Sequence, residues 1–223
     1  MKTKALDEYN IRNYDLVIFD CDGTLVDSEH LSNTLLAEML RELGVECDNQ
    51  EIIDLFIGTS FEKINNYIQD NVRKSPKFDF EQEFRKRCKI VFEQELRPIE
   101  GVVKFIESLK TKICVASNGP QEKMKVTLST TGLNKYFPDN CIFSACDIQK
   151  WKPEPDLFLF SASAMDTSST KSLVIEDTIH GAMGAIHAKM DVLAYSPDKN
   201  DNQFAENGIP TFASFAELMN SIL

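Results

Sequence analysis

The chain has 223 residues, 43% of them hydrophobic and 26% charged, which is the composition of an ordinary globular protein. The formal net charge of −11 argues against a general binding surface for nucleic acid or for an anionic membrane. Because the first residues are polar and no apolar run is long enough to cross a membrane, we expect a cytoplasmic protein that binds neither nucleic acid nor membrane.

The stretch from residue 16 to residue 29 is the one around which the chain is organised. The apolar run Leu16–Phe19 predicts a fully buried strand of a parallel sheet, and Asp20 and Asp22 follow it at once. Two carboxylates separated only by Cys21 repel each other unless a positive charge lies close, and hard cations such as Mg²⁺ prefer oxygen ligands. A polar turn is the simpler interpretation. We favour a functional site, because open α/β sheets bind ligands outside the carboxyl ends of their strands.

Residues 28–96 show the helical spacing of apolar residues and no strand pattern. Ser28 is the expected N-cap of the first helix, which ends at Gly44. Further helices are expected at Asn49–Phe56, Ser60–Val72 and Phe80–Leu96. The block is too long for a loop inside a compact domain, so it predicts a small helical domain inserted after the first strand.

The segment Phe56-Ile-Gly-Thr-Ser60 lies between two of these helices. Thr59 and Ser60 are candidates for contacts with substrate hydroxyl groups, although a helix N-cap explains Ser60 equally well. The two connections, at residues 26–28 and 96–98, are the expected hinge of a closing lid.

From Pro98 onward, strand and helix patterns alternate, which predicts right-handed crossovers and a doubly wound parallel sheet of the α/β class. We expect strands at Lys112–Ser117, Cys141–Ser144, Ser172–Glu176 and, as the last one, Val192–Tyr195. Helices are expected at Gly101–Leu109, Gln121–Thr131, Asp156–Met165 and Phe215–Leu223, with one more ending near Ala188. The predicted domains are therefore a core of residues 1–27 and 97–223 and an all-helical insert of residues 28–96.

Two polar motifs follow the second and third predicted strands. Ser117 and Asn118 offer hydroxyl, amide and backbone donors just before a helix, where phosphate oxygens bind well, although Ser-Asn-Gly-Pro is also the sequence of an ordinary turn. Lys152 stands between Trp151 and Pro153, and is either a fixed cation of the site or a solvated lysine in a proline-rich loop.

Glu176 and Asp177 follow the next strand and add two carboxylates at the edge that Asp20 and Asp22 share. Taken alone, they are also what the start of a helix favours. Four acids at one edge of a sheet need a metal ion to balance them. Together with the two motifs above, they predict a metal site beside a phosphate site, which is the arrangement that phosphoryl transfer requires.

The four motifs Asp20-x-Asp22-Gly-Thr, Ser117, Lys152-Pro and Glu176-Asp177 resemble, in order, those of the haloacid dehalogenase superfamily of phosphatases and phosphotransferases. The resemblance covers the whole core, implies a Rossmann-like sheet, and extends to the helical insert, which resembles that superfamily's cap. It implies that Asp20 is the nucleophile that forms an aspartyl-phosphate. Asp22 would be the general acid and then the general base.

The same resemblance implies which residues bind the cofactor and the phosphate. The implied Mg²⁺ ligands are Asp20, Asp22 through its backbone carbonyl, and Asp177, with Glu176 as a further ligand or just behind them. The implied phosphate ligands are the side chains of Ser117, Asn118 and Lys152 and the backbone N–H of Cys21.

Several activities remain open within and beyond this superfamily. Dehalogenases act without a metal and lack the second aspartate, so Asp22 argues against that activity. Mutases of the β-phosphoglucomutase type have extra cationic residues at positions that here correspond to Ser32, Phe61 and Pro120, so the residues found here favour hydrolysis. A phospho-acceptor signalling domain also uses an aspartate at a strand end, but such domains are much shorter and have no helical insert.

The core most resembles that of bacterial 6-phosphogluconate phosphatases, in runs such as Ser117-Asn-Gly-Pro with Lys123-Met124. We therefore predict a monomeric, Mg²⁺-dependent phosphatase that acts on a small phosphorylated metabolite, a sugar or sugar-acid phosphate with 6-phosphogluconate as the first choice. A sugar-phosphate mutase is the alternative.

Overall fold

The computed structural model describes residues 5–46, 48–56, 61–72, 76–197 and 202–223. The chain forms two compact units, one of residues 27–97 and one of residues 1–26 together with 98–223. Thr59 and Ser60, the candidates for contacts with substrate hydroxyl groups, lie outside the described residues.

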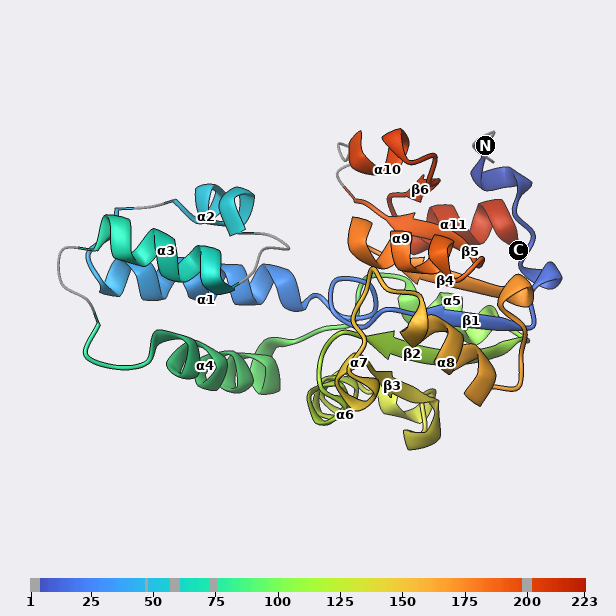
Figure 1. The fold of residues 1–223 in the computed structure, drawn as a ribbon, viewed down its shortest axis with the longest axis horizontal. Coiled ribbons are helices and arrows are strands. Elements are labelled where there is room, and N and C mark those ends of the chain that lie inside the picture. Colours follow the sequence, from blue (N-terminus) through green and yellow to red (C-terminus); the bar gives the residue numbers. More distant parts are fainter. Residues whose placement is uncertain (1–4, 47, 57–60, 73–75, 198–201) are drawn as a thin grey trace. The chain divides into compact units, whose positions relative to one another are not determined.

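The larger unit is built on a parallel sheet with the strand order β3-β2-β1-β4-β5-β6 (Figure 1). Its strands are β1 Leu16–Phe19, β2 Lys112–Ser117, β3 Ile142–Ser144, β4 Ser172–Glu176, β5 Asp191–Tyr195 and β6 Thr211–Phe212. The pairings are parallel, and β1 lies between β2 and β4. The predicted α/β class with a doubly wound parallel sheet is confirmed.

Helices lie between these strands and after the last one. They are α5 Val102–Ser108, α6 Gln121–Thr130, α7 Ala145–Ile148, α8 Asp156–Ala164, α9 Ile179–His187, α10 Asn202–Glu206 and α11 Phe215–Ile222. Short 3₁₀ turns lie at Leu6–Glu8, Ile11–Asn13, Leu133–Lys135, Asp139–Cys141 and Ser169–Lys171.

Alternate residues of β1 pack on opposite faces of the sheet, as the pleat of a strand requires. Leu16 and Ile18 belong to a buried cluster that includes Phe158 of α8. On the other face, the ring of Phe19 lies 6.1 Å from the ring of Phe105 in α5. Because helices cover both faces, all four residues of β1 are fully buried, and the strand ends at a fixed point in the core.

Two expectations about this unit are wrong. Val192–Tyr195 does not contain the last strand, because β6 pairs with β5 through Ala194 and Thr211. A strand of two residues is too short to show an alternating pattern. The short helices α7 and α10 are also absent from the predicted elements, since neither is long enough to show a helical period.

The described part of the smaller unit is helical, with α1 Ser28–Glu42, α2 Asn49–Phe56, α3 Phe61–Asn71 and α4 Phe80–Glu95. Leu36, Met39 and Leu40 of α1 are at most 1% exposed and form much of its interior. The ring of Phe61 in α3 lies 5.5 Å from that of Phe84 in α4, which joins these two helices.

The expected N-cap of α1 is wrong by one residue. Asp27 occupies the N-cap position and Ser28 is the first helical residue. The backbone of Asp27 has φ −82° and ψ 59°, outside the extended region that a capping side chain normally requires, and its side chain makes no capping hydrogen bond.

Among the described residues, no helix is both long enough and apolar enough to cross a membrane.

Candidate active site

The motifs at Asp20, Ser117 and Glu176 lie at the carboxyl ends of three adjacent strands, and Lys152 follows α7. The pairing of β1 with its neighbours places Phe19 opposite Val115 of β2 and Ile175 of β4. The backbone N–H of Asp20 continues the ladder and donates to the carbonyl of Ile175 at 2.9 Å. The sheet register therefore brings Asp20 to the edge where Ser117 and Glu176 end the neighbouring strands.

A tight turn follows Asp20. Gly23 has φ +80°, a conformation that favours glycine, and its N–H donates to the carbonyl of Val26 at 2.9 Å. The side chain of Cys21 is 1% exposed, and burial raises the pKa of its thiol well above the usual value. The thiol is therefore protonated at neutral pH, and its contribution is packing.

Lys152 joins two carboxylates at this edge. Its Nζ donates to Oδ1 of Asp20 at 2.5 Å and to Oε1 of Glu176 at 2.6 Å. The side chains of Lys152, Asp20 and Glu176 are 3%, 10% and 1% exposed. Burial opposes the ammonium ion, but the two carboxylates outweigh burial and raise the Lys152 pKa. The geometry favours a fixed cation over a solvated lysine.

The charge of Asp20 depends on the positive groups near it. Burial raises its pKa to about 7, with Glu176 and Asp22 acting in the same direction and the Lys152 ammonium acting against them. A further cation beside Asp20 would favour its carboxylate form, which is the form that can act as a nucleophile.

Both carboxylate oxygens of Glu176 accept hydrogen bonds from the protein. Oε1 accepts from Lys152, while Oε2 accepts from the backbone N–H of Asp177 at 3.0 Å and from the N–H and hydroxyl of Thr178 at 2.8 and 2.9 Å. A Cβ at Gly181 would lie 1.8 Å from Oε1, so glycine makes room for this carboxylate. Glu176 therefore orients Lys152.

Asp177 comes close to the turn after β1. The hydroxyl of Thr24, which is completely buried, donates to Oδ1 of Asp177 at 2.9 Å. A Cβ at Gly23 would lie 2.1 Å from Oδ2 of Asp177, so this glycine is needed for the approach. Asp177, the acid that follows β4, thus contacts the motif that begins at Asp20.

The oxygen donors at this edge fit a hard cation. The carboxylates of Asp20 and Asp177 and the backbone carbonyl of Asp22 are oxygen ligands of the kind that Mg²⁺ prefers. In the part of the chain that the structure describes, no three His, Cys, Asp or Glu side chains are grouped to hold a metal ion. Both oxygens of Glu176 accept hydrogen bonds from the protein, so the candidate ligands are the carboxylates of Asp20 and Asp177 and the carbonyl of Asp22.

The loop after β2 is tied to the other motifs. The Ser117 hydroxyl, on a residue 4% exposed, accepts the N–H of Gly119 at 3.2 Å, and Ser144 at the end of β3 donates to the Gly119 carbonyl at 2.7 Å. Oδ1 of Asn118 accepts the backbone N–H of Lys152 at 2.9 Å. Asn118 therefore fixes the loop that presents Lys152.

Asp22 forms an ion pair with Lys123. Its Oδ2 accepts from Nζ of Lys123, in the first turn of α6, at 2.7 Å, and the side chains of Asp22 and Lys123 are 25% and 44% exposed. The predicted site residues thus form two groups. Asp20, Lys152 and Glu176 are buried together, whereas Asp22 lies at the more open side.

The model of the haloacid dehalogenase-like hydrolase family matches residues 17–195, a range that includes all four motifs. The chain belongs to the haloacid dehalogenase-like hydrolases.

This hydrolase is similar to two named phosphatases and to a solved structure. It is 32% identical over 205 residues to the 6-phosphogluconate phosphatase of Escherichia coli, and the match covers 92% of each chain. It is 27% identical to the fructose-1-phosphate phosphatase of Escherichia coli, with 81% of this chain and 95% of that protein covered. A haloacid dehalogenase-like protein of unknown function from Agrobacterium tumefaciens has a similar structure, with a TM-score of 0.83, 27% identity, and 93% and 96% of the two chains covered. These matches confirm the predicted phosphatase class.

Four residues hydrogen-bond to the predicted site carboxylates or make room for them, but are not themselves among the predicted site residues: Thr24, Lys123, Thr178 and Gly181. Each lies within a few positions of a motif residue, in a turn or near the start of a helix. Gly181 had a sequence signal, because glycine in a helix is unfavourable unless packing requires it.

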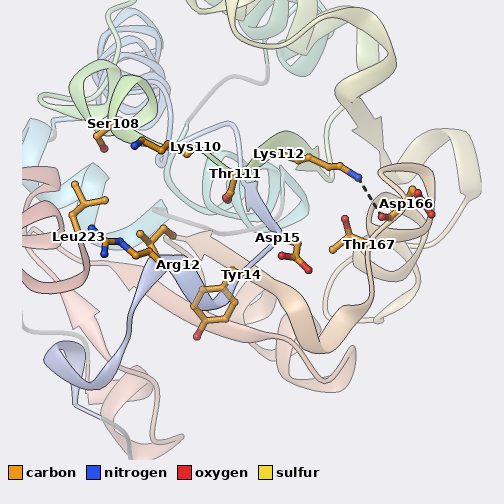
Figure 2. Close-up of a pocket in the computed structure, with 11 residues that line it drawn as sticks. Arg12, Tyr14, Asp15, Ser108, Lys110, Thr111, Lys112, Asp166, Thr167 and Leu223 are labelled. Atoms are coloured by element: carbon orange, nitrogen blue, oxygen red, sulfur yellow. Dashed lines mark hydrogen bonds between the residues drawn. The ribbon is translucent and has the colours of Figure 1, made fainter.

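A cavity of about 750 Å³ lies at the opposite edge of the sheet, where β1 and β2 begin (Figure 2). Tyr14 and Asp15, which precede β1, line it together with Thr111, which precedes β2. Nζ of Lys112 donates to the backbone carbonyl of Asp166 at 3.3 Å across one end. The cavity includes no predicted site residue, so it is separate from the candidate active site.

Proposed function

We propose that this chain is a Mg²⁺-dependent phosphatase that hydrolyses a small phosphorylated metabolite through an aspartyl-phosphate on Asp20. The observation that carries the proposal is the contact of 2.5 Å between the buried strand-end carboxyl of Asp20 and the buried ammonium of Lys152. A second aspartate, Asp22, lies two residues further on and is more exposed. The arrangement supplies a nucleophile, a cation and a separate group for proton transfer.

Asp20, Asp177 and the backbone carbonyl of Asp22 are the groups that would hold Mg²⁺. The turn at Gly23, into which Asp177 closely fits, supports this assignment. When bound, the ion supplies positive charge that favours the Asp20 carboxylate and stabilises the oxygens of the transferring phosphoryl group. Glu176 contributes indirectly, because its two oxygens hold Lys152 and the start of α9.

In the first half-reaction, a carboxylate oxygen of Asp20 bonds to phosphorus while the bond between phosphorus and the ester oxygen breaks. Asp22 is protonated at this stage and gives its proton to the departing oxygen. The products are an aspartyl-phosphate and the free alcohol.

In the second half-reaction, Asp22, now a carboxylate, takes a proton from a water molecule. The water oxygen bonds to phosphorus while the bond from phosphorus to Asp20 breaks. Inorganic phosphate leaves, Asp20 returns as a carboxylate, and Asp22 is protonated again. The net reaction is the hydrolysis of a phosphate ester to an alcohol and phosphate.

The phosphoryl oxygens need donors at the same edge. Lys152 provides a fixed ammonium and Ser117 a hydroxyl, and the backbone N–H of Cys21 follows the nucleophile directly. Asn118 acts mainly through Lys152, because its Oδ1 accepts the Lys152 backbone N–H at 2.9 Å. These donors match the charge of a transferring phosphoryl group.

We place substrate selection in the helical unit of residues 27–97, which acts as a cap with its hinge at residues 26–28 and 96–98. Two of its residues support hydrolysis over phosphate transfer within a sugar bisphosphate. The Ser32 hydroxyl donates to the Glu29 carbonyl at 3.1 Å, and the Phe61 ring packs 5.5 Å from the Phe84 ring. Neither residue offers a cation for a second phosphate group.

A sugar or sugar-acid phosphate is the proposed substrate class, with 6-phosphogluconate first. The similarity to the phosphatase named for that compound supports this choice, since it spans 92% of both chains and therefore includes the cap.

A phosphate-release panel with Mg²⁺ tests the proposed function. The panel contains 6-phosphogluconate, fructose 1-phosphate and other sugar and sugar-acid phosphates, and both free phosphate and the alcohol are measured. We expect equal amounts of the two products, with 6-phosphogluconate hydrolysed most efficiently. An isomerised sugar phosphate without free phosphate would contradict the proposal and identify a mutase.

A further inference from the structure

Lys123 lies outside the four motifs, yet it contacts a residue of the proposed machinery. Its Nζ donates to Oδ2 of Asp22 at 2.7 Å. It stands in the first turn of α6, and α6 begins directly after the loop of Ser117 and Asn118. An ion pair with this much exposure contributes little to stability, so a stabilising role does not explain it well.

The neighbourhood of Gly119 places this ion pair inside the candidate active site. A Cβ at Gly119 would lie 3.7 Å from Oγ of Ser117, 3.8 Å from Cδ of Lys123 and 3.9 Å from Oδ2 of Asp22. The proposed phosphate-binding hydroxyl, the stem of the lysine and the carboxylate therefore surround one backbone position. Lys123 thus lies beside two residues of the proposed machinery, Ser117 and Asp22.

The orientation of the Asp22 side chain is less restricted by its surroundings than that of Asp20. Asp20 is confined by burial and by Lys152, whereas 25% of the Asp22 side chain is exposed. A group that first gives a proton to the departing oxygen and then takes one from water has to remain at a fixed distance from both. Misplacement of a reacting group by about 1 Å can cost 10²-fold in rate.

We propose that Lys123 is a positioning residue, whose ammonium holds the carboxyl group of Asp22 beside the departing ester oxygen. This inference rests on the proposed phosphatase mechanism. Lys123 transfers no proton itself, and it acts through the direction of the Asp22 side chain.

The test compares two leaving groups. The departing oxygen of p-nitrophenyl phosphate is stable as an anion and needs no proton, whereas that of an alkyl phosphate needs one. The alkyl ester is the sugar phosphate that the wild-type enzyme hydrolyses fastest in the panel above. The value of kcat/KM is measured for both esters, because it reports the step in which the leaving group departs.

Lys123→Met removes the ammonium and keeps most of the stem, and Lys123→Arg keeps a cation. Lys125→Met is the matched control, because Lys125 lies on the same helix and pairs with Asp139 at 3.0 Å, away from the motif residues. Thermal unfolding of all variants shows whether folding is affected.

We expect Lys123→Met to lower kcat/KM for the alkyl ester by about 10- to 100-fold and for the aryl ester by less than about 3-fold. Lys123→Arg should recover part of the loss, and Lys125→Met should behave like the wild type. In an Asp22→Asn background, Lys123→Met should cause little further loss, because the two residues act as one unit.

An equal loss with both esters would overturn the inference, because it would assign Lys123 to phosphate binding. Wild-type activity of Lys123→Met with the alkyl ester would also overturn it. The proposed function is judged separately, by whether Asp22→Asn itself loses more activity with the alkyl ester than with the aryl ester.

Discussion

The ammonium of Lys152 lies 2.5 Å from Oδ1 of Asp20, in a place where only 3% and 10% of the two side chains are exposed. Glu176 contacts the same ammonium at 2.6 Å. One cation therefore balances two carboxylates away from water, and the group lacks one positive charge when both acids are ionised. A metal ion beside Asp20 would supply that charge, so the buried ion pair is consistent with the proposed dependence on Mg²⁺.

Replacing Lys152 by Met should destabilise the protein strongly at neutral pH, because it leaves Asp20 and Glu176 buried without their cation. Removing one partner of a buried ion pair costs about 3–5 kcal/mol. The free energy of unfolding in urea measures the effect, with Lys125→Met as the control for loss of a surface lysine. A loss no larger than that of the control would contradict the structural role given to Lys152.

Two glycine substitutions should have opposite outcomes. A Cβ at Gly181 would lie 1.8 Å from Oε1 of Glu176, whereas at Gly119 the nearest atom would be 3.7 Å away. Gly181→Ala should therefore displace Glu176 and with it Lys152, lowering both stability and phosphate release. Gly119→Ala should fold normally and keep the stability of the wild type, because its Cβ would make only ordinary van der Waals contacts. Equal behaviour of the two variants would show that Glu176 does not need the space at Gly181.

The metal ligands can be tested by binding rather than by activity. Mg²⁺ that binds the folded state raises the melting temperature. We expect this rise in the wild type and in Glu176→Gln, and a much smaller rise in Asp177→Asn. Removal of divalent metal by EDTA should stop phosphate release. Loss of the Mg²⁺-induced rise in Glu176→Gln but not in Asp177→Asn would reverse the ligand assignment.

The raised pKa of Asp20 predicts a pH-dependent stability in the absence of metal. Its pKa is raised from 3.8 to about 7, so its contribution to stability is fully present below about pH 4 and is lost as the pH rises through 7. In EDTA, the stability of the wild type relative to Asp20→Asn should therefore fall between about pH 4 and pH 7. Urea unfolding of both proteins across this range measures the difference. A difference that stays constant or rises with pH would contradict the environment described for Asp20.

Much of the fold follows from the sequence, because the central strands are short apolar runs that end at polar residues. The predicted bounds of Leu16–Phe19, Lys112–Ser117 and Ser172–Glu176 coincide with β1, β2 and β4. β6 could not be predicted, because only the pairing of its two residues with Ala194 and Tyr195 of β5 defines it as a strand. The missed N-cap at Asp27 depends on a local backbone conformation that residue type does not specify.

The candidate site, like the fold, is predictable from the sequence only in part. That the motif residues share one edge follows from the direction of parallel strands, since every strand presents its carboxyl end there. Which atoms contact which depends on the helices that follow. The family resemblance implies that Glu176 is a metal ligand or lies just behind the ligands, and only the structure shows that its carboxylate contacts Lys152 and occupies the space at Gly181. The partner of Asp22 was missed for a similar reason, because Lys123 reaches it only through the placement of α6.

The most direct test of the central claim is to trap the phosphoryl group on Asp20. Asp22→Asn lacks the base that activates water, and p-nitrophenyl phosphate needs no acid, so this variant with this ester and Mg²⁺ should form the aspartyl-phosphate and hydrolyse it slowly. The measurement is a burst of p-nitrophenol, followed by acid quenching and mass spectrometry of the peptide that contains Asp20. The account predicts about one equivalent in the burst and a phosphoryl group on Asp20 that is absent in the double variant with Asp20→Asn. Phosphorylation of a different residue, or turnover of that double variant, would contradict it.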